Sequence, residues 1–139
     1  MQYTLKLTRW DKDREDLSKV RRSVFIEEQQ VPEELEWDDD DKTSVHVLVT
    51  DNNTPIATGR IKMDGHIGRM AVLKEYRNKG IGSDMLKALI NFSKTLKMKT
   101  VYLHAQITAV PFYEKHGFKI SSDEFMDAGI PHKSMTLDV

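Results

Sequence analysis

A basic, glycine-rich turn is the part of the sequence whose residue types indicate chemistry most directly. It follows a short apolar stretch and reads Arg77-Asn78-Lys79-Gly80-Ile81-Gly82. Glycine allows a ligand to approach the backbone closely, and the unpaired N–H groups and dipole of a helix N-terminus favour an anion there. The two basic side chains add positive charge. The turn therefore predicts a site for a phosphate or pyrophosphate group.

This turn differs from two common nucleotide-binding motifs. It lacks the Gly-Lys-Ser/Thr ending of a P-loop and the third glycine of a dinucleotide fingerprint. For the segment by itself, an ordinary strand–helix turn with basic residues facing solvent remains the alternative.

A second segment further along the chain carries the other candidate chemistry. Residues 101–105 alternate as in a buried strand, and Thr108 is expected to cap a short helix with Pro111 in its first turn. Gly117 stands where the glycine that ends a helix belongs. This helix carries Tyr113, whose hydroxyl is a potential proton donor.

Together the two segments resemble the motifs of the GCN5-related N-acetyltransferases (GNAT). The acyl-CoA motif of that family is Arg/Gln-x-x-Gly-x-Gly/Ala after a strand, and it corresponds to residues 77–82. The later motif is a tyrosine-rich helix that ends in Gly-Phe, and it corresponds to residues 112–118. Two motifs in this order, about 30 residues apart, are more specific than either one. Residues 21–32, followed by Glu36-x-Asp38 and His46, resemble a small bacterial branch of the family.

The resemblance implies one α/β domain over residues 1–139, with the acyl-CoA N-acyltransferase fold of the GNAT family. Its sheet would be mixed but mostly antiparallel and flanked by helices. Two adjacent central strands, 66–73 and 100–105, would be splayed to admit the cofactor. A chain of 139 residues is long enough for one domain with a substantial core, but not for two.

Apolar periodicity predicts the first elements. Residues 2–8 alternate as a strand, with Tyr3, Leu5 and Leu7 on one face. A helix capped by Asp11 or Asp13 should then run to about residue 25, followed by a loop or short helix around 27–40.

Turn signals and periodicity predict the later elements. Residues 51–54 and 64–65 read as hairpin turns, with residues 55–63 as the strand between them. A helix of roughly four turns should follow the glycines, and residues 132–139 should form the last strand.

The strand before the glycine-rich turn has an irregular pattern. Ile67 is apolar at an odd position, whereas Met70 and Val72 are apolar at even ones. A β-bulge near residues 68–71 would bring these side chains to one face and free backbone N–H groups. The alternative is a strand buried on both faces. The resemblance implies the bulge, with the freed amides of Met70, Ala71 and Val72 holding the pantetheine arm and the thioester carbonyl.

Amide formation from a thioester needs a neutral amine, a donor for the oxyanion and a proton for the departing thiolate. Tyr113 matches the family tyrosine that protonates the CoA sulfur, although a half-buried structural tyrosine is the alternative. Seven residues earlier the family often has asparagine, and here Gln106 keeps the amide on a longer arm. The resemblance assigns cofactor contacts to Met70, Ala71, Val72, Arg77, Asn78, Lys79, Gly80, Ile81, Gly82 and Gln106.

The sequence does not single out one residue as the general base. The branch pattern offers Glu28 and His46, and His104 lies on a strand near the expected cleft. Each also reads as an ordinary structural residue, and ordered water could carry the proton instead.

An acidic segment, residues 33–41, has seven carboxylates in nine positions. Three interpretations stay open: a solvated loop, a wall that attracts a cationic acceptor, and a hard-cation site. The last fits least, because the spacing does not match an EF-hand and no glycine supplies the turn.

Composition excludes several classes of function. The formal net charge of −1 argues against general nucleic-acid binding. The absence of cysteine excludes disulfides, thiolate catalysis and Cys-ligated zinc, and no metal is expected. No apolar run approaches a membrane span and no signal core is present, so a cytoplasmic protein is expected.

These observations predict an N-acetyltransferase that transfers an acetyl group from acetyl-CoA to a primary amine by direct attack in a ternary complex. The rival is a non-catalytic acyl-CoA-binding or regulatory module on the same fold, and Tyr113 favours the enzyme. A protein that serves only in protein–protein interaction would not explain the glycine-rich turn at residues 80–82. The acceptor stays open among small amines, polyamines, antibiotics and protein N-termini. Homodimers are common in the family, and one is compatible with this sequence.

Overall fold

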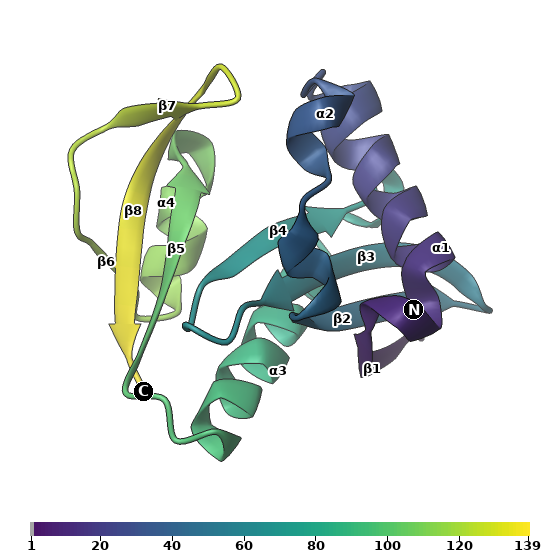
Figure 1. Cartoon of the computed structure of the whole chain (residues 1–139), viewed down its shortest axis with the longest axis horizontal. Helices are drawn as coiled ribbons and strands as arrows, with labels where there is room; N and C mark the ends of the chain where they lie inside the picture. Colours follow the sequence, from purple (N-terminus) through teal and green to yellow (C-terminus); the bar gives the residue numbers. More distant parts are fainter. Residues whose placement is uncertain (1) are drawn as a thin grey trace.

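The structure is a computed structural model that describes residues 2–139, and it contains two antiparallel sheets (Figure 1). The first sheet has the order β1 (Thr4–Arg9), β2 (Val45–Asp51), β3 (Thr54–Ile61) and β4 (Ile67–Val72). In the second, β5 (Thr100–Gln106) pairs with β8 (Ile130–Asp138), which also pairs with β6 (Lys119–Ile120) and β7 (Phe125–Asp127). A single parallel bridge, His66 to Tyr102, is the contact between the sheets that makes the arrangement mixed.

The helices lie around the first sheet and beside the second. α1 (Trp10–Arg21) continues as the π-helical η1 (Arg22–Glu28) and is followed by α2 (Glu33–Glu36) and η2 (Asp39–Lys42). α3 (Ile81–Thr95) lies on the opposite side of the first sheet from α1 (Figure 1). The remaining helical segments are η3 (Lys74–Tyr76), η4 (Ile107–Ala109) and α4 (Val110–Lys115).

The core follows from this layering. On the α3 side, Val45, Val47 and Val49 of β2 join one buried cluster with Met85 and Leu89. On the α1 side, the buried residues Val20, Val24 and Ala71 form a second cluster. Alternation along the strands explains the two clusters, because successive side chains of a strand point to opposite faces.

The predicted β-bulge in β4 is confirmed. Thr58 pairs with Ala71 and Arg60 pairs with Gly68, so β4 has one more residue than β3 between these pairs. Arg69 has a φ of 52°, in the left-handed region, as the extra residue requires. The bulge changes the parity of the strand, and Ile67, Met70 and Val72 therefore all contact the α3-side core.

Several local expectations are confirmed and others are wrong. Both predicted hairpin turns are present, and Asn52 and Asn53 adopt the positive φ values that a two-residue turn requires. Leu7, expected on the buried face, is 42% exposed, because β1 is the edge strand of its sheet. The hairpin between β7 and β8, with positive φ at Ala128 and Gly129, was not expected.

The predicted caps of two helices are also wrong. α1 begins at Trp10, with Arg9 at the N-cap position, and neither Asp11 nor Asp13 caps it. The Asp13 carboxylate instead accepts a hydrogen bond from the Thr8 hydroxyl. α4 has Ala109 at its N-cap, because Thr108 belongs to the 3-10 turn η4 that precedes it.

Candidate active site

The cleft between β4 and β5 follows from the way the two sheets meet. Within residues 2–139, β4 pairs with β3 alone and β5 with β8 alone. The two strands are joined at the His66–Tyr102 bridge, where the Tyr102 N–H donates to the Gly65 carbonyl over 3.0 Å. Beyond the bridge their edges separate around a cleft of about 330 Å³. The expected splay of these strands is therefore confirmed.

Tyr113 lies in this cleft, as do Met70 and Gln106. Its side chain comes from α4 and packs against the rings of Phe112 and Phe118, at centroid distances of 5.0 and 5.8 Å. The residue is 8% exposed, and burial raises the pKa of its hydroxyl to about 12. A tyrosine is protonated at neutral pH even at its ordinary pKa of 10, so burial only strengthens the state that a proton donor needs.

The glycine-rich turn forms the N-terminus of α3, a helix of 15 residues. Gly80 is its N-cap, with a φ of 85°, and a side chain at this position would meet no atom within 4 Å. Backbone conformation, and not crowding, therefore calls for glycine here. A Cβ on Gly82 would lie 3.5 Å from the ring of Phe112, so the turn is beside α4. An open helix N-terminus with free N–H groups fits a phosphate.

Arg77 is held by the end of η1. Its guanidinium forms two hydrogen bonds with the Glu28 carboxylate, of 2.7 and 2.6 Å, and a third of 2.9 Å with the Val72 carbonyl. The hydrogen bonds from Arg77 lower the pKa of Glu28. Glu28 does not line the cleft that contains Tyr113. The structure thus ties this candidate base to the first residue of the glycine-rich turn.

Gln106 is held by the next residue of the same segment. Its amide N–H donates to the Gln29 side chain over 2.8 Å, across 77 positions of sequence. Glu28 and Gln29 therefore each contact one of the residues expected to bind the cofactor.

The two histidine candidates lie in different environments. His46 is 1% exposed, its ring is 5.5 Å from Trp10, and its Nε2 lies 2.9 Å from the Asp41 carbonyl oxygen. Burial lowers the pKa of His46, and the residue does not line the cleft. His104 lines the cleft with an exposed side chain, and its ring lies 4.7 Å from that of His66.

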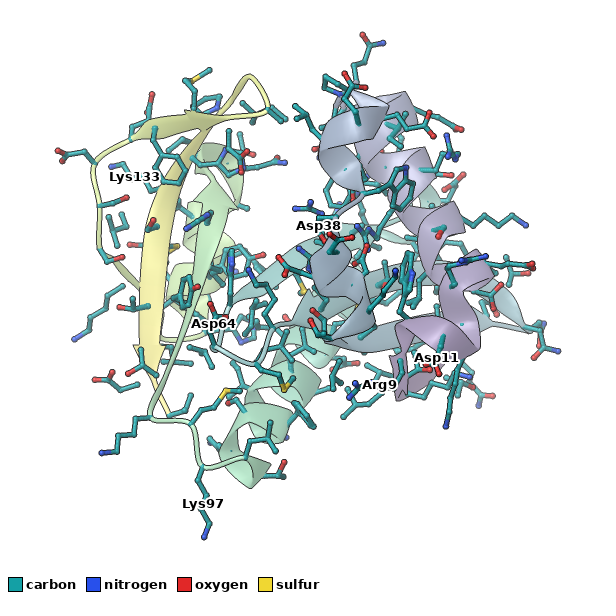
Figure 2. The ribbon with its side chains drawn as sticks, viewed as in Figure 1. Arg9, Asp11, Asp38, Asp64, Lys97 and Lys133 are labelled. Atoms are coloured by element: carbon teal, nitrogen blue, oxygen red, sulfur yellow. The ribbon has the colours of Figure 1, made fainter. Side chains whose placement is uncertain are left out.

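The acidic segment is not a solvated loop. Glu36 and Asp41 are buried, and Arg21 donates to both, over 2.8 and 2.6 Å. Arg60 donates to Asp41 over 2.7 Å and to Asp38 over 2.8 Å. Figure 2 shows Asp38 near the gap between the two halves of the molecule. Three of the seven carboxylates, Glu36, Asp38 and Asp41, are thus part of an ionic network with Arg21 and Arg60.

The cleft is also lined by residues that the sequence reasoning did not select as site residues, among them Glu36, His66, Arg69 and His132. Arg69 occupies the bulge, and the Glu36 carboxylate lies 3.1 Å from its Nε. Burial raises the pKa of Glu36. The bulge prediction could have identified Arg69, since a bulge re-aims its side chain. The position of His132 depends on a hairpin that was not expected.

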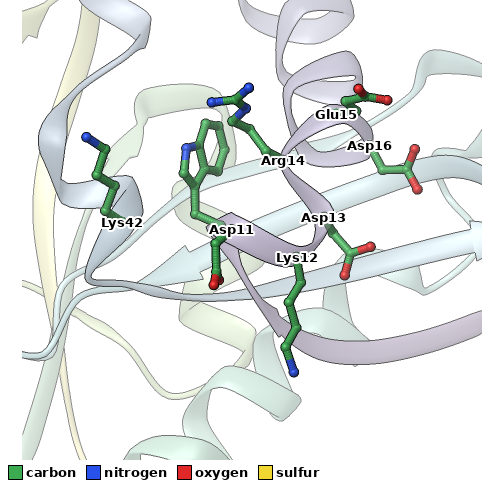
Figure 3. A pocket seen from close by; sticks show the side chains of 8 residues that line it. Asp11, Lys12, Asp13, Arg14, Glu15, Asp16 and Lys42 are labelled. Carbon is green, nitrogen blue, oxygen red and sulfur yellow. The ribbon is translucent and has the colours of Figure 1, made fainter.

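A second hollow, of about 650 Å³, lies over the first turns of α1 and next to Lys42 (Figure 3). It contains none of the predicted site residues. In residues 2–139 no helix has the length and apolar composition needed to cross a membrane. The same residues include no group of three or more His, Asp or Glu side chains arranged to hold a metal ion.

Comparisons with known proteins agree with this geometry. A sequence model described as the acetyltransferase (GNAT) domain matches residues 12–139. YjcF of Bacillus subtilis (strain 168), described as an uncharacterized N-acetyltransferase, is 42% identical over 123 residues, which are 86% of this chain and 88% of YjcF. YyaT of the same strain is 41% identical over 133 residues, 91% of this chain and 90% of YyaT.

A solved structure gives the same result for the fold. Escherichia coli ElaA superposes with a TM-score of 0.86 at 27% identity, and covers 97% of this chain and 99% of its own. The expected bacterial branch is thus confirmed along with the fold. On the match over residues 12–139 and the relatives at 41% and 42% identity, the chain belongs to the GNAT family of acetyltransferases and is an acyltransferase enzyme.

Proposed function

We propose that the protein transfers an acetyl group from acetyl-CoA to a small primary amine, by direct attack of the amine on the thioester. One observation carries the proposal: a bulged strand edge and a buried, protonated tyrosine line the same cleft. The edge of β4 at Met70–Val72 that faces away from β3 would receive the acyl end of the cofactor. Gly80–Gly82 and the α3 N-terminus would bind its pyrophosphate, with Lys79 adding charge.

Tyr113 would give its proton to the departing thiolate, which accepts it as the C–S bond breaks. The acceptor must lose one proton to attack. Of the three candidate bases, His104 alone lines the cleft. The proton therefore leaves either to His104 or to water in the cleft. The whole chain would act as one catalytic domain.

The phosphate turn is tested by an isosteric pair of variants, Gly82→Asp and Gly82→Asn. Space beside Gly82 is sufficient for a side chain, since the nearest atom would be 3.5 Å from its Cβ. A carboxylate near a helix N-terminus does not destabilise the helix, so both variants should fold. We expect acetyl-CoA to raise the Tm of the unmodified protein and of Gly82→Asn. It should leave the Tm of Gly82→Asp unchanged.

The same experiment includes thiol release from acetyl-CoA with a panel of amines. Acetyl-CoA binding with equal affinity to Gly82→Asp and Gly82→Asn would contradict the assignment of the phosphate site. Failure of the parent to bind acetyl-CoA would contradict the proposed function itself.

A further inference from the structure

The acidic segment has little free charge to attract a cationic acceptor. Besides the ionic network of Glu36, Asp38 and Asp41, Asp40 pairs with Lys62 at 3.2 Å and Glu33 with Arg22 at 2.6 Å. Over the residues that the structure describes, this leaves Glu34 and Asp39 as the carboxylates of the segment without an ion pair. Neither lines the cleft. The interpretation of this segment as an attracting wall is therefore not supported by its contacts.

The charges that line the cleft are mostly neutralised by partners within the chain. Among its cations, Arg60 pairs with Asp38 and Asp41, Lys62 with Asp40, and Arg69 with Glu36. Of the two carboxylates that line it, Glu36 is shared between Arg21 and Arg69, which leaves Asp127 without an ion pair in the described residues. One free carboxylate suits an acceptor with one ammonium, whereas further positive charges would be desolvated without a partner. A polyamine fits this cleft less well than a monoamine.

Aromatic and imidazole rings form one wall of the cleft. His66 stacks on Tyr102 with centroids 4.6 Å apart and planes at 15°, and the His104 ring lies 4.7 Å from His66. Phe125 is 5.3 Å from His104 and 5.9 Å from His132. Of these five rings, the three imidazoles line the cleft. Burial and the neighbouring His104 lower the pKa of His66 to about 4, so its ring is neutral at pH 7.

Apolar side chains from the first half of the chain also line the cleft. Phe25 belongs to η1, Val31 lies in the following loop, and Leu35 belongs to α2. Leu35 is 55% exposed, so its side chain is open to an acceptor in the cleft. The volume of about 330 Å³ is at the small end of the range for ligand sites.

From these walls and charges we infer that the acceptor is a small monoamine with a flat aromatic body, which stacks against the imidazole rings of His66 and His104. The inference rests on the proposed function and specifies its acceptor. Offset or edge-to-face ring contacts stabilise an aromatic group more than an aliphatic group of similar size. Arg69 adds a guanidinium plane to the same site.

Three amines test the class of acceptor: 2-phenylethylamine, hexylamine and spermidine, each with acetyl-CoA and detection of the released thiol. We expect kcat/KM for 2-phenylethylamine to exceed that for hexylamine by about two- to tenfold, the value of one ring contact. Spermidine should be the poorest acceptor. A preference for spermidine, or equal values for the two monoamines, would overturn the inference while leaving the acetyltransferase activity established.

Variants of His104 distinguish a role of its ring in stacking from a role in proton transfer. His104→Ala should raise KM for 2-phenylethylamine by a larger factor than KM for hexylamine. His104→Phe keeps a ring without a titrating nitrogen, and should restore the KM. A loss of kcat for all amines in both variants, with KM unaltered, would assign His104 to proton transfer and not to stacking.

A binding measurement tests the stacking site without depending on turnover. Addition of 2-phenylethylamine to the full-length protein should shift the imidazole C–H resonances of His66 and His104 in an NMR titration. The resonances of His46, which does not line the cleft, are the internal control. Shifts with hexylamine of the same size, or none with 2-phenylethylamine, would contradict the stacking site even if no amine were acetylated.

Discussion

Tyr113 combines the two properties that a general acid in this cleft requires. Its hydroxyl is in a site that also contains the bulged edge of β4, and burial keeps it protonated by raising its pKa to about 12. The neighbouring rings of Phe112 and Phe118 fix its position. Its packing would be retained without the hydroxyl, so the acid role can be isolated by mutation.

Tyr113→Phe should lower kcat by about 10²–10⁴-fold, the usual contribution of a general acid. The Kd for acetyl-CoA should stay close to that of the parent. Single-turnover thiol release and calorimetry measure the two quantities separately. Turnover equal to that of the parent, in a regime where chemistry limits the rate, would mean that Tyr113 is a structural residue.

Glu28 is a poor base in this arrangement, because Arg77 holds its carboxylate and lowers its pKa. Glu28→Gln should therefore leave kcat nearly unchanged. Removal of the carboxylate leaves the charge of Arg77 unneutralised, so KM for acetyl-CoA should fall by about two- to fivefold at low salt. The adjacent, exposed Glu27→Gln is the matched control. A large loss of kcat in Glu28→Gln alone would restore the base role.

At the scale of elements, the segment containing α2 and η2 is attached by buried ion pairs. Burial alone would raise the pKa of Asp38, but hydrogen bonds from Arg60 and the charges of Arg60 and Arg69 lower it to about 2. The ordinary value is 3.8. Because the folded-state pKa is depressed, this stabilisation is complete above about pH 4 and is lost as the pH falls towards 2.

Asp38→Asn should accordingly flatten the fall in the free energy of unfolding between pH 4 and pH 2. The side chain is 33% exposed, so solvent screening reduces the contribution, and we expect about 1–2 kcal/mol. Denaturant titrations across this pH range measure it. Asp39→Asn, on the same segment and without an ion pair within residues 2–139, should retain the slope of the parent. Identical slopes for both variants would contradict the assignment.

For the molecule as a whole, the limited contact between the two sheets is the main consequence of the splay. One bridge connects β4 to β5, and the facing edges beyond it have no strand partner among the described residues. A cofactor that inserts between these edges would pair with both. Its binding should therefore order the cleft as well as stabilise the folded state.

Hydrogen exchange provides the test. We expect amides along β4 from Gly68 to Val72, and along β5 from Leu103 to Gln106, to exchange more slowly once acetyl-CoA is added. Amides of β2, in the middle of the first sheet, should change little and are the reference. Protection confined to the α3 N-terminus would mean that the pantetheine arm does not lie between the strands.

Features that depend on local geometry could be predicted from the sequence. A positive φ favours glycine or asparagine, which is why the turn at Gly80 and the hairpin at Asn52 and Asn53 could be predicted. Strand alternation has a period of two, so the parity change between Ile67 and Met70 already indicated the bulge. The motif around Tyr113 indicated the family for the same reason: its residues are close in sequence.

Which side chains meet depends on how the elements pack, and could not be predicted from the sequence. Glu28 and Arg77 are 49 positions apart, and Arg60 reaches Asp38 and Asp41 across 22 and 19 positions. No local periodicity encodes these pairings. In the sequence, charged residues of either sign are expected at the surface, and their partners are identified only when packing places them side by side. The acidic segment therefore reads as free charge in the sequence, and no local pattern relates His66 to His104. Packing of α1 and β3 against the acidic segment places its carboxylates beside Arg21 and Arg60, and the bridge between the two sheets places His66 beside His104.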